Sequence, residues 1–275
     1  MTHLQSLLEP VMTIAREAGQ QIRGIYEAGE YQSLTKSDNT PVTSADLAAH
    51  ESILSALRAL TPNIPILSEE DAEVPLAERR TWQEYWLIDP LDGTQEFIAR
   101  SGEFAVNIAL VRDHRPVLGV IYAPMSETWY YACQGGGAFK RQGETRQAIH
   151  ARVVKPGDEL RIAVSRRQRK EAVMERLDEQ RRYLLLPFGS ASLKSCMVAE
   201  GEADCYLRLG PTGEWDTGAS QCIVEEAGGR IVDTCYQALS YNKRETLENP
   251  NYMVLGSQAL PWPEILPPGP ECFFD

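Results

Sequence analysis

The chain has 275 residues, of which 43% are hydrophobic and 24% are charged. This size and composition suit one large globular domain or two smaller ones, and no apolar run approaches the ~20 residues that a transmembrane helix needs. The formal net charge of −12 disfavours binding to nucleic acid or to anionic membranes. A phosphorylated ligand would be repelled as well, unless a metal ion or a local basic pocket lies at its binding site.

The N-terminus and the cysteines indicate in which cellular compartment the protein is expected. The first residues lack the basic segment and apolar block of a secretory signal. The six cysteines are scattered and include no C-x-x-C pair. We therefore expect neither a zinc site nor a disulfide framework, and we expect a reducing, cytoplasmic location.

The first half of the chain predicts two helices followed by antiparallel strands. Leu4, Leu7, Val11 and Ile22 fall at helical spacing, and Gly29 is a plausible stop. Apolar runs separated by turns then predict strands. The expected elements are helices at 3–28 and 45–60 with a loop at 34–46 between them, and strands at 64–68, 85–90, 104–112, 117–122 and 129–133.

The second half alternates apolar runs with helical patterns, which is typical of βαβ units. A polar stretch at 140–158 is expected to carry the crossover into it, and the tail at 261–275 is rich in proline and expected to be irregular. We thus expect an α/β (α+β) chain of two parts, an α+β part at 1–150 and an α/β part at 151–275. The expected elements are strands at 162–165, 183–187 and 205–209, and helices at 166–181, 190–200 and 217–227.

Acidic residues follow three of these predicted boundaries. Glu69 and Glu70 come directly after one strand, Asp89 and Asp92 follow the next, and Asp216 lies at the start of a helix. Ligands in α/β proteins gather at such positions. Carboxylates from separate segments could hold Mg²⁺, a hard cation that takes oxygen ligands. Two such ions could hold both the attacking water and the leaving oxygen of a phosphate ester.

The D-P-L-D-G-T segment adds features that suit phosphate chemistry. Pro90 stiffens the turn, Gly93 allows the backbone to approach a phosphate, and Thr94 adds a hydroxyl that could orient water. Taken singly, each acidic group has an ordinary explanation as a solvated loop, an Asp-Pro turn or a helix cap. Their combination, in order and at strand ends, favours a metal-dependent phosphatase, whose reaction depends mainly on positioning and charge stabilisation.

Several basic or polar residues suit the phosphate itself. Residues 189–194 open a helix directly after a strand, so that Ser190 lies among free backbone N–H groups and Lys194 could add a charge. Arg208 precedes a Gly-Pro-Thr-Gly run that could flank the same pocket. Lys36, in the early loop, could neutralise nearby carboxylates.

At this point the sequence resembles the inositol monophosphatase superfamily. The resemblance rests on I-L-S-E-E-D at 66–71, W-L-I-D-P-L-D-G-T at 86–94 and E-W-D-T-G-A at 214–219, and runs from Lys36 to Gly229. It implies a layered αβαβα sandwich that hydrolyses small phosphomonoesters with two or three magnesium ions per site. Lithium inhibition, dimers and, in some relatives, peripheral association with the cytoplasmic face of the inner membrane are also known in this superfamily.

The resemblance also implies residue roles. Glu69, Asp89, the carbonyl of Leu91, Asp92 and Asp216 would bind the metals, and Glu69, Asp89, Thr94 and Asp216 would act in catalysis. Glu70 would support the metal ligands without binding a metal itself. Asp46 and Lys36 would support a third, more weakly bound ion. The substrate would contact Glu69, Leu91, Asp92, Gly93, Thr94, Ser190, Lys194, Arg208 and Asp216.

Residues 189–217 are most similar to the bacterial 3'(2'),5'-bisphosphate nucleotidase branch. This implies hydrolysis of adenosine 3',5'-bisphosphate, a by-product of sulfate assimilation, to AMP and phosphate.

Three alternatives remain open. The aspartyl-phosphate phosphatases also carry an Asp pair after a strand, but at spacing i and i+2, whereas Asp89 and Asp92 are three apart. An inositol monophosphatase or a fructose-1,6-bisphosphatase-like enzyme would share the metal motifs and differ only at 189–217. A non-catalytic phospholigand sensor would not need Glu69 and Thr94, the residues expected to activate water.

Overall fold

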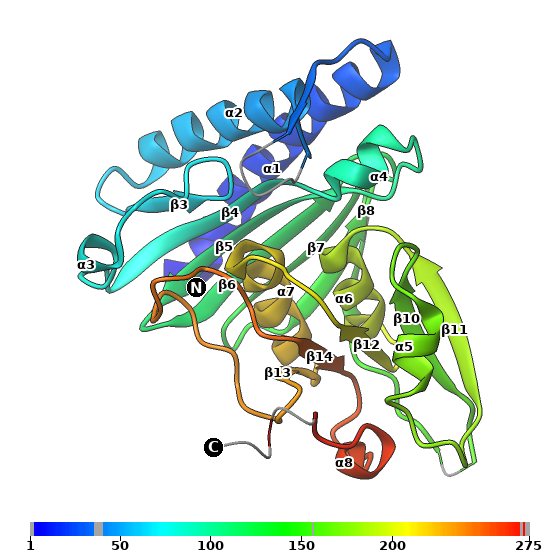
Figure 1. Ribbon diagram of the computed structural model, residues 1–275. Coiled ribbons are helices and arrows are strands. Elements are labelled where there is room, and N and C mark those ends of the chain that lie inside the picture. Colours follow the sequence, from blue (N-terminus) through cyan, green and yellow to red (C-terminus); the bar gives the residue numbers. More distant parts are fainter. Residues whose placement is uncertain (1–2, 36–40, 156, 270–271, 273–275) are drawn as a thin grey trace.

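A computed structural model of the chain describes residues 3–35, 41–155, 157–269 and 272 (Figure 1). Helices and sheets alternate in layers, so the expected αβαβα sandwich is confirmed. Lys36 lies outside the described residues. Among the helices of the described part, none is long and apolar enough to cross a membrane.

The first layer consists of α1 (His3–Ala28) and α2 (Ser44–Leu60), both close to the expected ranges. One stripe of each helix is buried against the first sheet, as the spacing of Val11, Ile22 and Leu57 requires. The preceding segment at 34–46, expected to be a loop or β-turn, contributes to two short antiparallel strands, β1 (Ser33–Thr35) and β2 (Pro41–Thr43).

The first sheet has the strand order β3-β4-β5-β6-β7-β8-β9. β3 is parallel to β4, and every later pair is antiparallel. The crossover expected at 140–158 is wrong in part, because a hairpin continues the sheet there; four of the five β9 residues are exposed, so no apolar alternation marks that strand. The strands are β3 (Ile66–Ser68), β4 (Glu84–Asp92), β5 (Ala105–Arg112), β6 (Arg115–Ala123), β7 (Thr128–Cys133), β8 (Ala138–Gln142) and β9 (Thr145–Ile149).

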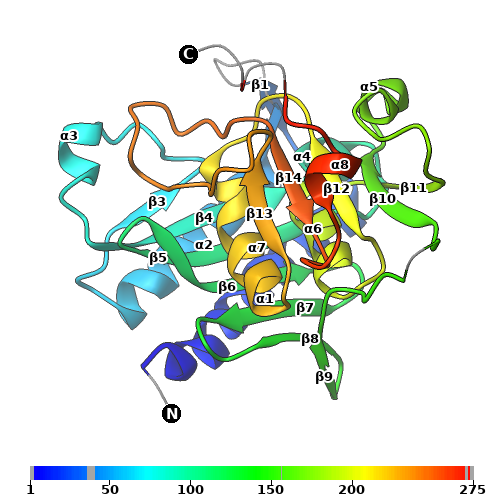
Figure 2. The ribbon, with the colours of Figure 1, turned by 90° about the horizontal axis from the view of Figure 1, so that it is seen from below.

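The middle layer consists of α6 (Ala191–Ala199) and α7 (Glu214–Glu226), which lie between the two sheets (Figure 2). α7 packs very closely on the first sheet. A Cβ on Gly119 of β6 would lie 2.2 Å from the carbonyl oxygen of Ala219, and a Cβ on Gly218 would lie 2.9 Å from Leu87. Glycine at these positions therefore sets the distance between α7 and the sheet.

The second sheet has the order β11-β10-β12-β14-β13. β10 runs parallel to β11 and β12, as the βαβ pattern predicts, whereas β14 is antiparallel to both of its neighbours and was not predicted. The strands are β10 (Leu160–Ser165), β11 (Tyr183–Phe188), β12 (Cys205–Arg208), β13 (Arg230–Asp233) and β14 (Tyr252–Leu255).

Two short helices cover the outer face of the second sheet. The helix expected at 166–181 is wrong in extent, since only α5 (Lys170–Met174) forms. Within that charged stretch only Val173 and Leu177 are buried, so no continuous apolar stripe docks a longer helix. The tail, expected to be irregular, contains α8 (Trp262–Ile265), which buries Trp262 in the same outer core.

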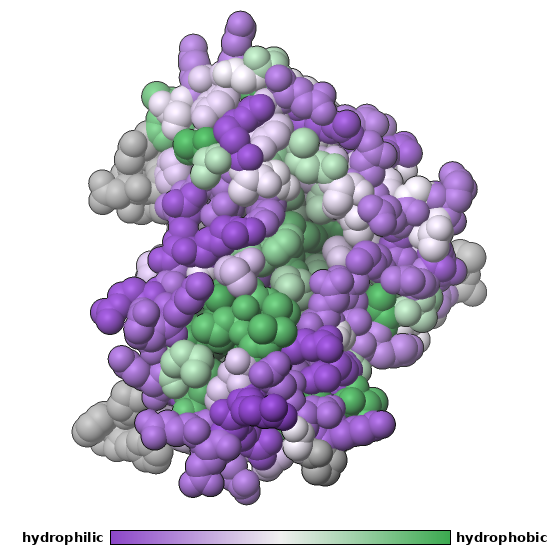
Figure 3. All heavy atoms as spheres, turned by 90° about the vertical axis from the view of Figure 1, so that its right-hand side faces the viewer, coloured by the Kyte–Doolittle hydropathy of each residue, from purple (hydrophilic) through white to green (hydrophobic). Residues whose placement is uncertain are grey.

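β11 forms an edge of the second sheet and is unusually apolar. Leu184 is 45% exposed, and Leu185, Leu186 and Phe188 are half-buried. On the side of the molecule that carries this edge, hydrophobic atoms gather in the hollowed middle of an otherwise hydrophilic face (Figure 3).

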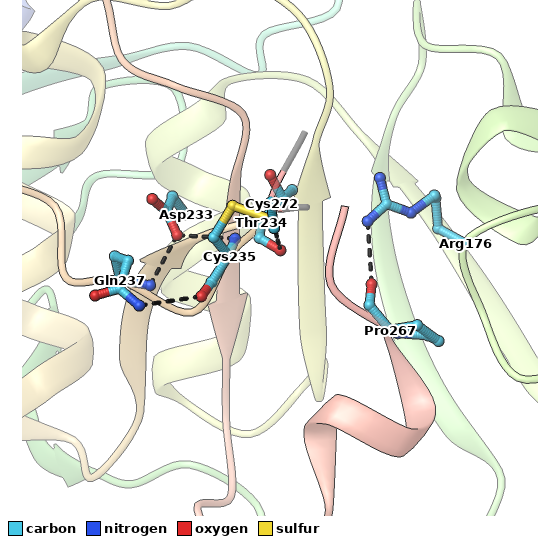
Figure 4. The surroundings of a disulfide bond; sticks show 7 residues. All are labelled: Arg176, Asp233, Thr234, Cys235, Gln237, Pro267 and Cys272. Carbon is cyan, nitrogen blue, oxygen red and sulfur yellow. Dashed lines mark hydrogen bonds between the residues drawn. A yellow bond between two sulfur atoms is a disulfide. The ribbon is translucent and has the colours of Figure 1, made fainter. Parts of the chain in front are cut away.

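A disulfide joins Cys235 to Cys272, with Cα atoms 5.5 Å apart (Figure 4). The expectation that the cysteines form no disulfide is therefore wrong for this pair. The separation of 37 residues gives no local motif, and only the fold brings the C-terminal segment back to the turn after β13. That turn is fixed by Asp233, which accepts the backbone N–H groups of Cys235 and Gln237. The other four cysteines are buried and free.

Candidate active site

A pocket of about 720 Å³ opens where β4 ends and α6 and α7 begin. Its walls also include α4 (Thr94–Ile98), the ends of β10 and β12, and a rim formed by residues 245–248. The strand and helix ends that the sequence marked with acidic residues therefore meet around one cavity.

Four of the carboxylates that line this pocket come from the predicted acidic segments. Asp89, Asp92 and Asp216 each place one oxygen atom within 4.8 Å of the other two. Glu69 also lines the pocket, because its N–H donates to the carbonyl of Ile88 and so continues the pairing of β3 with β4. Oxygen donors at this spacing, from three segments of chain, suit a hard divalent cation.

Burial and neighbouring carboxylates raise the pKa of Asp89 and of Asp216. Burial raises the pKa of Asp89 well above its usual range, and the charges of Glu69, Asp92 and Asp216 and a hydrogen bond with Glu69 raise it further. Burial also raises the pKa of Asp216, with help from Asp92 and Glu69, although the Gly213 N–H that donates to its Oδ2 at 2.6 Å acts in the opposite direction. A bound cation would offset this repulsion and favour the ionised form of both carboxyl groups.

Asp92 has a second task. Its Oδ2 accepts hydrogen bonds from the Ser190 hydroxyl at 2.5 Å, the Ser192 hydroxyl at 2.5 Å and the Ser192 N–H at 2.7 Å, and its Oδ1 accepts the Ala191 N–H at 3.2 Å. The carboxylate thus holds the start of α6 against the end of β4. Ser190, which was predicted to contact a substrate, lies in the pocket wall with its hydroxyl engaged on Asp92.

The end of β4 is shaped by a break in its pairing with β5 between Asp89 and Asp92. The Leu91 N–H donates to Asp89 Oδ1 at 3.0 Å, and Leu91 and Gly93 both line the pocket. Gly93 has φ = 99°, a conformation that favours glycine, and a Cβ there would lie 3.2 Å from the carbonyl oxygen of Glu103.

Thr94 and Asp46 form a hydrogen-bonded pair beside the carboxylates. The Thr94 hydroxyl lies 2.9 Å from Asp46 Oδ1, to which it donates. Asp46 Oδ2 accepts both the N–H and the hydroxyl of Thr43, at 2.7 and 2.6 Å, at the start of α2. Burial raises the pKa of Asp46, and the charge of Glu70, which lies outside the pocket wall, contributes to the rise. Both oxygens of Asp46 are therefore occupied by hydrogen bonds.

Both basic residues predicted for the substrate line the pocket, but their charges are partly engaged. The buried Lys194 Nζ donates to the carbonyls of Gly189 and Ser190, the latter at 2.7 Å, and burial lowers the pKa of Lys194 to about 8. Arg208 donates through Nη2 to the carbonyl of Pro211 at 3.0 Å. Lys194 thus stabilises the turn before α6, whereas Arg208 is half-buried at the pocket wall.

Arg167 is a pocket residue that the sequence analysis missed. It follows β10, and its guanidinium contacts the Glu96 carboxylate at 3.1 Å and the Gln95 carbonyl at 3.0 Å. The same rule that singled out the acidic residues, that ligands gather at the carboxyl ends of parallel strands, would have found it. Trp215 and Tyr206 also line the pocket.

The rim at 245–248 was missed as well, and a buried arginine holds it in place. Arg79 is 1% exposed and donates to the Glu245 carbonyl at 2.8 Å and to Asn242 Oδ1 at 2.7 Å. From the other side, the Glu214 N–H at the start of α7 donates to the Leu247 carbonyl at 2.8 Å. No sequence signal pairs these distant residues.

Comparisons with known proteins identify the family of this chain. The family model of the inositol monophosphatase family matches residues 3–259. The chain is 49% identical to the 3'(2'),5'-bisphosphate nucleotidase CysQ of Aggregatibacter actinomycetemcomitans, over 94% of this chain and 96% of the relative. It is 43% identical to the protein of the same name from Haemophilus influenzae, over 96% and 98% of the two chains.

A solved structure is also similar. The crystal structure of CysQ from Bacteroides thetaiotaomicron, a bacterial member of the inositol monophosphatase family, superposes with a TM-score of 0.80 at 36% identity, over 93% of this chain and 99% of that one. The fold, the carboxylate cluster and the extent of the family match lead to one conclusion: the chain belongs to the inositol monophosphatase family.

Proposed function

We propose that this protein is a magnesium-dependent phosphomonoesterase that hydrolyses adenosine 3',5'-bisphosphate to AMP and phosphate, and so supports sulfate assimilation. One observation carries the proposal: a pocket of nucleotide size is lined both by a carboxylate cluster and by Arg167, Lys194 and Arg208. The names of its close relatives support the choice of a bisphosphorylated nucleotide.

The donor set fits the metal. Two or three Mg²⁺ ions would be held by Glu69, Asp89, Asp92, Asp216 and the carbonyl of Leu91, since all five residues line the same pocket. When bound, the metal would polarise the phosphate and lower the pKa of water.

Thr94 and Asp46 would then receive the proton of the attacking water. Because Thr94 donates its hydroxyl hydrogen to Asp46, the lone pairs of its oxygen remain available to accept a hydrogen bond from water. Asp46 is fixed by Thr43 and has a raised pKa, which makes it a better proton acceptor than an ordinary aspartate. No covalent phospho-aspartate is needed.

The second phosphate of the substrate would meet the basic wall of the pocket. Arg167 and Arg208 are the candidates, because the Lys194 ammonium is buried and already donates to two carbonyls. Guanidinium groups bind phosphate oxygens in pairs, which suits this task. An inositol phosphate with a single phosphate would not use this wall.

The test is phosphate release from adenosine 3',5'-bisphosphate, inositol 1-phosphate and fructose 1,6-bisphosphate, measured side by side with Mg²⁺ and with EDTA. We expect the nucleotide to react fastest and EDTA to stop the reaction. A faster reaction with inositol 1-phosphate or fructose 1,6-bisphosphate would refute the assigned substrate but would still support a metal-dependent phosphatase. Binding of the nucleotide without any turnover would favour a sensor.

Further properties are expected from the sequence and from the family resemblance, and stay predictions. They are inhibition by lithium, a dimer, a cytoplasmic location with peripheral attachment to the inner membrane, and a division into subdomains at 1–150 and 151–275. Phosphate release in the presence of LiCl and the mass in solution test the first two directly.

A further inference from the structure

Asn107 of β5 is the sheet neighbour of Asp89, one of the clustered carboxylates. In the register of the first sheet it is paired directly with Asp89 of β4. Directly paired residues of antiparallel strands project from the same face, with Cβ atoms about 4.5–5.5 Å apart. The face is the one covered by α7, because Leu87 and Ala109, which alternate in phase with this pair, pack in the core between the sheets.

The side chain of Asn107 is buried and makes no hydrogen bond. It is 1% exposed, and neither Oδ1 nor Nδ2 has a partner within the described part of the chain. Its neighbours on this face are Ala105 and Ala109 along β5 and Ile121 across on β6, all of them apolar. A buried amide without partners is costly, and an apolar side chain of the same size would remove that cost.

The polar groups that the sheet register brings beside Asn107 are carboxylates. Asp89 is its direct partner, and Asp92 is paired with Ala105, two residues along the strand. The remaining contacts of Asp89 are the Leu91 N–H on Oδ1 and the hydrogen bond with Glu69. A cation held by Asp89 and Glu69 would replace this last hydrogen bond, and a lone pair of Asp89 that does not face the cation could then accept a hydrogen bond from Asn107.

We propose that Asn107 is a positioning residue of the metal site: its Nδ2 donates to the Asp89 carboxylate, directly or through one buried water, and orients it toward the cation. The inference rests on the metal site of the proposed function. Groups that hold a ligating carboxylate from behind typically change metal affinity about 10- to 100-fold when they are removed.

The test separates metal affinity from stability. Binding of MnCl₂ and MgCl₂, without substrate, is measured by calorimetry for the wild type, Asn107→Leu and Asn107→Ala, and thermal unfolding is measured in EDTA. For Asn107→Leu we expect metal affinity to fall about 10- to 100-fold while the unfolding temperature in EDTA does not fall. Asn107→Ala, which is smaller, should lose the same affinity even if leucine proves too bulky to fold.

Tyr85→Phe is the matched control. Tyr85 lies on β4, four residues before Asp89, and its hydroxyl is likewise buried without a partner. This variant should bind metal as the wild type does. Wild-type affinity in both Asn107 variants would overturn the inference alone, whereas a wild type that binds no divalent cation would overturn the metal site and this inference together.

Discussion

Replacing Asp89 by asparagine should stabilise the metal-free protein and abolish activity. Asp89, Asp92 and Asp216 hold oxygen atoms within 4.8 Å of one another. Two full charges at that distance repel by about 3 kcal/mol at an effective dielectric constant near 20. Because partial protonation already relieves some of this repulsion in the wild type, we expect Asp89→Asn to gain about 2 kcal/mol of unfolding free energy. This gain raises the unfolding midpoint by about 4–8 °C.

The sign of the pH dependence follows from the raised pKa of Asp89. A carboxyl group whose pKa is higher in the folded state contributes stability that is fully present below its unfolded pKa of about 3.9 and is lost as the pH rises through the folded pKa. Asparagine does not titrate. The advantage of Asp89→Asn over the wild type in EDTA should therefore be small at pH 5 and larger at pH 8.

Thermal unfolding at both pH values measures this effect, in EDTA and in MgCl₂ at about a hundredfold above the Kd measured for the wild type, where binding adds about 2.7 kcal/mol. Magnesium should stabilise the wild type only, so that the order of the two proteins reverses. Asp71→Asn is the control, because Asp71 is an exposed carboxylate two residues after Glu69, and this variant should show neither effect. A less stable Asp89→Asn protein in EDTA at pH 8 would refute the argument that these charges repel one another.

Four further predictions test other parts of the site. Thr94→Ala should lower kcat about 10²- to 10⁴-fold with little change in metal affinity, because it removes the link to Asp46; equal kcat would contradict that role. Arg167→Ala should raise the KM for the bisphosphate about tenfold and leave the KM for a nucleoside monophosphate unchanged. An equal rise in both KM values would exclude contact between Arg167 and the second phosphate. Asp92→Asn should lower the unfolding midpoint even in EDTA, since it breaks a buried cluster of hydrogen bonds worth about 2–3 kcal/mol, and an unchanged midpoint would contradict the anchoring of α6. Cys235→Ser should cost about 2–4 kcal/mol of unfolding free energy, measured in denaturant without reductant, by releasing a closed loop of 37 residues.

The parts of the fold that the sequence predicts are those with a strong local signal. The apolar stripe of α1 predicts a helix and the apolar run of β4 predicts a strand, and the D-P-L-D-G-T segment marks the turn where the pocket forms. The hairpin of β8 and β9 has no such signal, because β9 is mostly exposed and is defined only by pairing with β8. Residues 166–181 show the opposite error: their charged composition favours a helix, but too few apolar residues dock one.

The site divides in the same way. The sequence predicts a shared site for Glu69, Asp89, Asp92 and Asp216 from their positions at element ends, and the fold brings them to the lining of one pocket. What the sequence could not provide are contacts between distant segments, such as Arg79 with the rim at 245–248. These depend on packing that no local spacing encodes.

The close contact between α7 and the first sheet has a consequence for how this protein tolerates mutation. Asp216 reaches the other carboxylates only because Gly119 and Gly218 let the α7 backbone rest on the strands. Even alanine at Gly119 would meet the Ala219 carbonyl oxygen at 2.2 Å and push the helix outward. In a saturation mutagenesis screen scored by growth, Gly119 should therefore tolerate substitution as poorly as the carboxylates do, although it has no side chain and does not line the pocket.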